Sequence, residues 1–163
     1  MFVNLKSALS RLGLFTGSLL VLGVTAGATA NDASVSNWEA QNGNIPVTVT
    51  LTGITETQGP IYVSIQTREQ YQSIKGFGGI LQEASLGEMS ATYNIVEPGE
   101  YAVSVWHDLD NDGRFSMTKD YQITDGWGAS GDAPENRAPT FDDVKIKVET
   151  FGATVPVEMK YPN

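Results

Sequence analysis

Three aspartates at alternate positions are the residues of this chain with the clearest chemistry. Asp108, Asp110 and Asp112 follow an apolar stretch and are succeeded at once by Gly113. Carboxylates this close repel one another unless a cation lies between them. The four residues match the first, third, fifth and sixth places of a helix-loop-helix calcium loop, whose seventh residue, here Arg114, offers its backbone carbonyl. The spacing therefore predicts a Ca²⁺ site.

The rest of the calcium loop departs from that pattern. Its ninth place is Ser116, and its twelfth, where a bidentate glutamate belongs, is Lys119. Because one strong ligand is replaced, the expected Kd is modest, about 10⁻⁴–10⁻³ M, as in extracellular modules. The alternative is a solvated turn whose aspartates cap their own backbone. The predicted metal ligands, including two later carboxylates that would complete the shell if the chain curls back, are Asp108, Asp110, Asp112, Arg114, Ser116, Asp120 and Asp125.

His107, the only histidine, borders the aspartates. It could act as a general base or zinc ligand, or it could end a strand and hydrogen-bond the loop behind it. A catalytic zinc site usually takes three protein ligands, and the chain has no other histidine and no cysteine. A Ser-His-Asp arrangement stays open, but the sequence has no nucleophile elbow. The structural role is favoured, with a small hydrolase that uses His107 and a neighbouring aspartate as the alternative.

Two tryptophans, Trp106 and Trp127, lie in or beside the loop region. Tryptophan near carboxylates and amides is typical of sugar-binding faces, because the ring offers an apolar surface among polar groups. The alternative is that Trp106 packs inside the domain and Trp127 covers the loop. Carbohydrate or peptide binding through Trp127 is therefore a further hypothesis.

The first 30 residues are predicted to be a cleavable signal peptide. They combine a basic start (Lys6 and Arg11), an apolar run over residues 12–24 and a small-residue end at residues 28–30. Residues 31–44 are expected to form a loose leader, and residues 45–163 a single domain without a membrane span. The protein is therefore expected to be exported, periplasmic or extracellular, with a carbohydrate or an envelope protein as its partner.

The chain is acidic, with a formal net charge of −9, and it has no cysteine. Nucleic acid and anionic membrane surfaces are poor partners for such a charge. Disulfides are available to exported proteins, and this one does without them. A divalent ion is a natural clamp for its long loops.

Alternation of apolar and polar residues predicts about seven short strands. The clearest covers residues 101–106 and delivers His107 and Asp108 at its end. Residues 69–87 are expected to form a loop with a helical turn or an irregular edge strand, and residues 108–139 a long Asp/Gly-rich loop. Other expected strands cover residues 45–51, 61–65, 89–95, 121–123, 141–148 and 153–161. The pattern predicts an all-β antiparallel sandwich, immunoglobulin-like or prealbumin-like.

Three segments carry a family resemblance: PGEYAVSVWHDLDNDG (98–113), ITDGWGASG (123–131) and PTFDDV (139–144). They resemble the P-G-x-Y-A-V-x-V-x-H-D, P-T-E-G-Y-G-F-S-N and P-x-F-x-x-A motifs of a bacterial family of small exported proteins, domain of unknown function 2141. The resemblance implies a β-sandwich and no established activity. Asp125 stands where the family has glutamate, Ile123 where it has proline, and Ser116 where it usually has an acidic residue. Because the first two segments recur together, we hypothesise that Asp125 folds over the aspartate loop.

These observations favour a non-enzymatic, calcium-stabilised binding or surface module of the cell envelope.

Overall fold

The structure is a computed structural model and describes residues 43–162 apart from residues 74, 120–121 and 135–136. The predicted signal peptide and most of the predicted leader lie outside the described residues. Within the described part, no helix is long and apolar enough to cross a membrane. Regular structure begins at Ile45, the residue at which the domain was expected to start.

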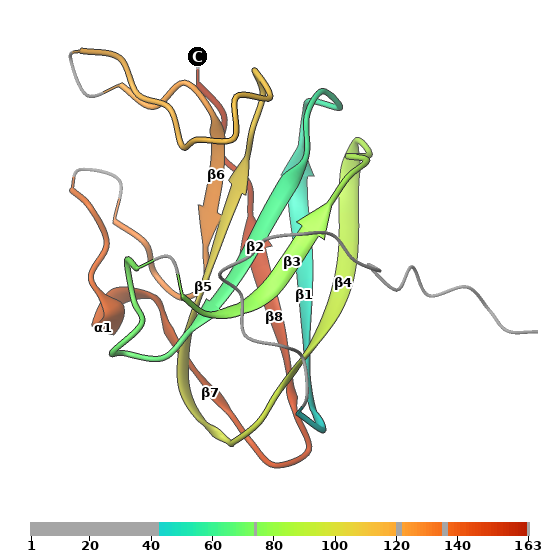
Figure 1. The fold of residues 1–163 in the computed structure, drawn as a ribbon, viewed down its shortest axis with the longest axis vertical. Coiled ribbons are helices and arrows are strands. Elements are labelled where there is room, and N and C mark those ends of the chain that lie inside the picture. Colours follow the sequence, from blue (N-terminus) through green and yellow to red (C-terminus); the bar gives the residue numbers. More distant parts are fainter. Residues whose placement is uncertain (1–42, 74, 120–121, 135–136, 163) are drawn as a thin grey trace, which may run out of the picture.

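Two β-sheets face each other in a sandwich (Figure 1). The three-stranded sheet has the order β4-β1-β8, with β4 at Gly87–Ile95, β1 at Ile45–Ile54 and β8 at Ala153–Glu158. The five-stranded sheet has the order β3-β2-β5-β6, with β3 at Phe77–Leu81, β2 at Ile61–Gln66, β5 at Gly99–His107 and β6 at Gly126–Ala129. Its fifth strand, β7 at Lys145–Val148, pairs with the first half of β5. The prediction of an all-β sandwich is confirmed.

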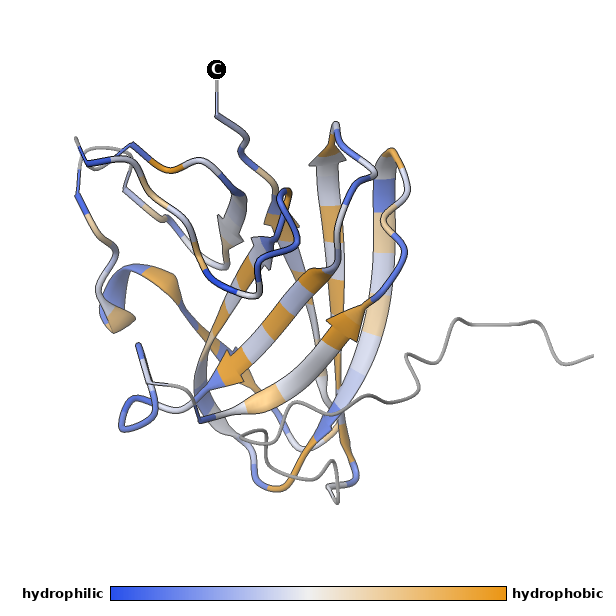
Figure 2. Cartoon of the chain, turned by 45° about the horizontal axis from the view of Figure 1, so that its top comes forward, coloured by the Kyte–Doolittle hydropathy of each residue, from blue (hydrophilic) through white to orange (hydrophobic). Residues whose placement is uncertain are grey.

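The core lies between the two sheets because apolar residues alternate with polar ones along the strands. Val47, Val49 and Leu51 of β1 are at most 1% exposed, and the threonines between them are half-buried. Figure 2 shows this alternation as bands along the strands. Burying each such side chain contributes about 1.5–3 kcal/mol. Val103 and Val105 bring β5 into the same core, so the strand that ends at the aspartates is anchored in the middle of the sandwich.

One strand pair corrects the expectation of a wholly antiparallel sandwich. β1 and β8 run parallel, with Val47 opposite Ala153 and Leu51 opposite Val157. The chain leaves the five-stranded sheet at the end of β7 and enters the other sheet as β8, alongside β1. Alternation shows which face of a strand is buried but not the direction of its neighbour, so the sequence did not reveal this pairing.

The expected strand over residues 141–148 begins instead as a helical turn, α1 (Phe141–Val144), and only its second half is strand β7. Thr140 and Asp143 form a capping box at the start of the turn. Phe141 and Val144 are buried against Ala102 on the outer face of β5. An apolar pair three residues apart lies on one face of a helical turn but on opposite faces of a strand, so this spacing fits the turn and the strand prediction was wrong there.

Strands β3 and β6 lie in segments for which the sequence predicted a loop, as one of two alternatives for β3 and as the only prediction for β6. β3 is the edge strand that was one of two alternatives for residues 69–87. β6 was missed because Gly126 and Gly128 are poor strand formers. Both glycines are needed for close packing, since a Cβ at Gly126 would lie 2.6 Å from Tyr161 Cε1 and one at Gly128 would lie 2.7 Å from Val157 Cγ1. The candidate strand at 121–123 lies partly outside the described residues; its last residue, Ile123, forms an isolated bridge with Met117.

Candidate functional site

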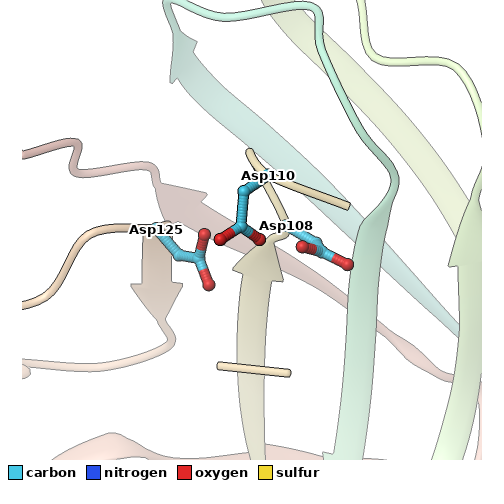
Figure 3. A group of neighbouring side chains, drawn as sticks. All are labelled: Asp108, Asp110 and Asp125. Atoms are coloured by element: carbon cyan, nitrogen blue, oxygen red, sulfur yellow. The ribbon is translucent and has the colours of Figure 1, made fainter. Parts of the chain in front are cut away.

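The register between β5 and β6 places two aspartates side by side at one end of the five-stranded sheet. The strands are antiparallel, and His107 pairs with Gly126. Asp108, which follows β5, therefore lies next to Asp125, which precedes β6 (Figure 3). The structure thus places Asp125 at the aspartate loop.

Three carboxylates converge at this point. Asp108, Asp110 and Asp125 each offer an oxygen, and these atoms lie within 4.8 Å of one another. Figure 3 shows the side chains of Asp110 and Asp125 turned toward each other beside Asp108. Asp108 is 0% exposed and Asp125 is 1% exposed, whereas Asp110 faces solvent. The group therefore has two buried members and one open side.

The carboxylate of Asp125 holds three donors from different parts of the site. Its Oδ1 accepts from the backbone N–H of Leu109 at 3.2 Å. Its Oδ2 accepts from the backbone N–H of Ser116 and from the indole Nε1–H of Trp106, both at 2.9 Å. Asp125 therefore ties Leu109 and Ser116, at the two ends of the aspartate-rich turn, to the start of β6.

The carboxylate of Asp108 stabilises the turn of the aspartate loop by accepting two backbone hydrogen bonds. Its Oδ1 accepts from the backbone N–H of Asp112 at 3.1 Å, and its Oδ2 accepts from that of Gly113 at 2.9 Å. A carboxylate has about four acceptor positions. Donors of the described residues occupy two of these positions on Asp108 and three on Asp125, so both carboxylates retain acceptor capacity.

Of the described carboxylates among the other predicted ligands, that of Asp112 is not a member of this convergent group. The carboxylate of Asp112 accepts from the backbone N–H of Arg114 at 2.8 Å, which is the self-capping turn considered as the alternative. Ser116 contributes its N–H to Asp125, and its hydroxyl lies 3.5 Å from the carbonyl oxygen of Arg114. Asp120 lies outside the described residues. Of the seven predicted ligands, the structure brings together Asp108, Asp110 and Asp125.

The negative charge of the group has no cationic partner among the described side chains. The ion pairs there involve other carboxylates, on Glu100, Asp142, Asp143 and Glu149. Desolvation, followed by the charge of Asp112, raises the pKa of Asp110. Burial and the charge of Asp108 raise the pKa of Tyr62 on the neighbouring strand. The loop therefore has the electrostatics of a site suited to a cation.

The turn between β1 and β2 clamps the backbone of Asp108. The N–H of Asp108 donates to the carbonyl of Pro60 at 3.0 Å. Gly59 has φ +78°, and a Cβ on it would lie 1.7 Å from the carbonyl oxygen of Asp108. Only glycine fits this conformation and this contact. Sequence reasoning missed Gly59, for which the one signal was its place in a Gly-Pro turn.

His107, the last residue of β5, is fully buried. Its Nδ1 lies 2.9 Å from the hydroxyl oxygen of Tyr161, and among the described residues its Nε2 has no hydrogen-bond partner. This is the structural role favoured from sequence, with Tyr161 as the partner instead of the loop. Nothing in the sequence pointed to Tyr161, which lies 54 positions away. Burial raises the pKa of Tyr161 to about 12.

The histidine gives the protein a pH dependence with a defined sign. Burial lowers the pKa of His107, although the carbonyls of Gln58 and Gly59 oppose the shift. The stability from a neutral buried histidine is complete above its unfolded pKa, about 6.5, and is lost as pH falls from there through the lowered folded pKa. We expect the melting temperature to fall as pH is lowered from 7.5 to 5, because the free energy of unfolding decreases by at most about 1.4 kcal/mol per pH unit.

The control for this pH dependence is His107→Gln, which lacks a titrating ring. Its melting temperature should be lower but flat over the same range. Asp142 does not confound the test, because hydrogen bonds from Arg68 and Lys145 lower its pKa to about 2. An equal slope in the variant would show that His107 is not the titrating group.

Trp106 lies on the outer face of the sheet and ties the loop to β2. Its ring stacks on Tyr62 with centroids 4.2 Å apart, and Phe115 of the loop meets it edge-on at 6.4 Å. The sequence left open which face of the sheet carries Trp106. Because Val103 and Val105 point into the core, Trp106, which follows Val105 in the strand, points to the opposite face. Tyr62 was missed because it is distant in sequence from the loop.

The fold and the site define a small β-sandwich protein with an aspartate-rich loop at the end of its central strand. Residues 49–155 match the model of a family described as uncharacterized protein conserved in bacteria (DUF2141), and the chain belongs to this family. The match includes both segments that build the site, so the sequence resemblance is confirmed. Comparison with the curated proteins and with the solved structures gave no match.

Proposed function

We propose that the protein is a non-enzymatic, calcium-stabilised module of the bacterial cell envelope. The observation that carries the proposal is the convergence of Asp108, Asp110 and Asp125 within 4.8 Å, two of them buried and none paired with a cationic side chain of the described chain. Hard carboxylate oxygens are the ligands that Ca²⁺ prefers. The ion would neutralise the negative charges of these three carboxylates, which otherwise repel one another.

Calcium would act on the fold by joining two strand ends. Asp108 follows β5 and Asp125 precedes β6, so an ion held by both fixes the 16-residue connection between them more firmly than the separate backbone N–H donors of the two carboxylates do alone. Three carboxylates supply fewer than the six to eight oxygens of a full shell, and water completes it. The expected affinity is therefore modest, and the proposed export through residues 1–30 places the protein where such an affinity is sufficient.

The hydrolase alternative receives less support. A general base must come within hydrogen-bond reach of the substrate, and His107 is 0% exposed. Ser130, one of the serines in the matching segment, is also buried, and its hydroxyl accepts from the N–H of Val103 at 2.9 Å. Both residues serve the packing of β5.

Thermal unfolding with and without calcium tests the proposal. A ligand that binds only the folded state stabilises it by about 2.7 kcal/mol at a hundredfold excess over Kd. We expect a rise of several degrees in saturating calcium, its loss on chelation, and a smaller effect from Mg²⁺, which demands a tighter octahedral shell. Asp110→Asn should lose the response, whereas Glu88→Gln, at the exposed beginning of β4, should keep it. An unchanged melting temperature in wild-type protein would refute the proposal.

A further inference from the structure

A groove of about 410 Å³ lies on the outside of the sandwich where β6 meets β8. This volume falls in the range of small-molecule sites. None of the three convergent aspartates lines the groove. Its walls include the side chains of Thr52, Trp127, Asp132, Glu158 and Lys160.

The groove combines one aromatic surface with several polar groups. Trp127 is half-buried, and the Lys160 ammonium lies 5.3 Å from the centroid of its ring. Asp132 and Glu158 present exposed carboxylates, and Thr52 adds a hydroxyl. Two carboxylates beside one ammonium disfavour an anionic ligand. The mixture suits a neutral polyhydroxylated molecule, whose C–H face packs on the ring while its hydroxyls donate to the carboxylates.

The floor of the groove is held rigidly by backbone contacts. Trp127 and Lys160 exchange two hydrogen bonds, from Trp127 N to Lys160 O at 2.8 Å and from Lys160 N to Trp127 O at 2.7 Å. Gly128 lets β6 lie against β8, because a Cβ there would come within 2.8 Å of the carbonyl oxygen of Glu158. The backbone that carries Trp127 and Lys160 is therefore positioned before a ligand arrives, which reduces the entropic cost of binding.

We propose that this groove binds a segment of a neutral carbohydrate, with Trp127 as the stacking surface and Glu158 and Asp132 as hydroxyl acceptors. The ligand is a short run of uncharged sugar units, such as an exposed neutral glycan offers. The site does not depend on the calcium proposal, since the two use different side chains.

Calorimetric titration of the protein with maltohexaose, cellohexaose and chitohexaose tests this inference. At least one of these sugars should bind, and Trp127→Ala should weaken that binding at least tenfold. Trp127→Phe should lose less, and Glu158→Gln should weaken binding severalfold by removing a charged acceptor. Phe151→Ala, which removes an aromatic ring that is 82% exposed outside the groove, should leave binding unchanged.

Two further measurements distinguish carbohydrate binding from unfolding of the variant and from the binding of a basic peptide. Trp127→Ala should still unfold in a single cooperative thermal transition, which shows that the variant is folded. Pentalysine represents a basic peptide and should bind more weakly than the sugar. The inference is overturned if none of the three sugars binds, if Trp127→Ala binds as well as wild type, or if pentalysine is preferred.

Discussion

Asp125→Ala is expected to lower the free energy of unfolding by about 3–5 kcal/mol in calcium-free buffer, because three donors lose one acceptor together. The Trp106 indole and the backbone N–H groups of Leu109 and Ser116 all point to this carboxylate, which is 1% exposed. Each donor left unsatisfied in a buried position costs about 1–3 kcal/mol, and the sum is reduced where water can enter beside the half-buried indole. Chemical denaturation with Trp fluorescence as the readout measures the loss.

Asp112→Ala is the matched control for this prediction. Its carboxylate is exposed and accepts from the backbone N–H of Arg114. Removing one solvent-exposed cap should cost about 1 kcal/mol or less. Equal losses in the two variants would mean that Asp125 does not organise the loop.

Gly59→Ala is also expected to lower the free energy of unfolding by about 3–5 kcal/mol, the upper range for a single residue. The new Cβ would require the carbonyl of Asp108 to move, since the two atoms would otherwise lie 1.7 Å apart. The positive φ of +78° adds the usual cost of about 1–2 kcal/mol for a residue with a side chain. The same movement should weaken calcium binding, because Asp108 carries one of the convergent carboxylates.

Gly87→Ala separates these two causes. Gly87 has a similar φ of +87°, but a Cβ there would meet no atom within 4 Å. Gly87→Ala should lower the free energy of unfolding only by the cost of the left-handed backbone conformation, about 1–2 kcal/mol, and should leave calcium binding unchanged. A loss in Gly59→Ala no greater than that in Gly87→Ala would contradict the proposed clamp on Asp108.

The strands that the sequence predicted well are those with strict alternation. β1, β2, β4 and β5 were expected near their observed positions, and β5 delivers His107 and Asp108 as anticipated. The reason is physical, because a strand with one face in the core must alternate apolar and polar residues. The aspartate spacing likewise pointed to the loop in which two of the three convergent carboxylates, Asp108 and Asp110, lie.

The parts that were missed depend on contacts between distant segments. β6 carries two glycines that only the approach of Val157 and Tyr161 explains. The sequence analysis named both Asp112 and Asp125 as ligands, and the register of β5 and β6, which no local pattern encodes, is what brings Asp125 into the convergent group. The partner of His107 is likewise set by the position of the last residues of the chain.

The central proposal is tested most directly by calorimetric titration of calcium into three chelator-treated proteins: wild type, Asp110→Asn and Asp112→Asn. The two substitutions remove the same charge two positions apart on exposed residues, but only Asp110 belongs to the convergent group. We expect one ion per wild-type chain with a Kd of about 10⁻⁴–10⁻³ M, nearly unchanged binding in Asp112→Asn, and at least tenfold weaker binding in Asp110→Asn. Absence of calcium binding to the wild-type protein, or equal weakening in both variants, would contradict a site built from Asp108, Asp110 and Asp125.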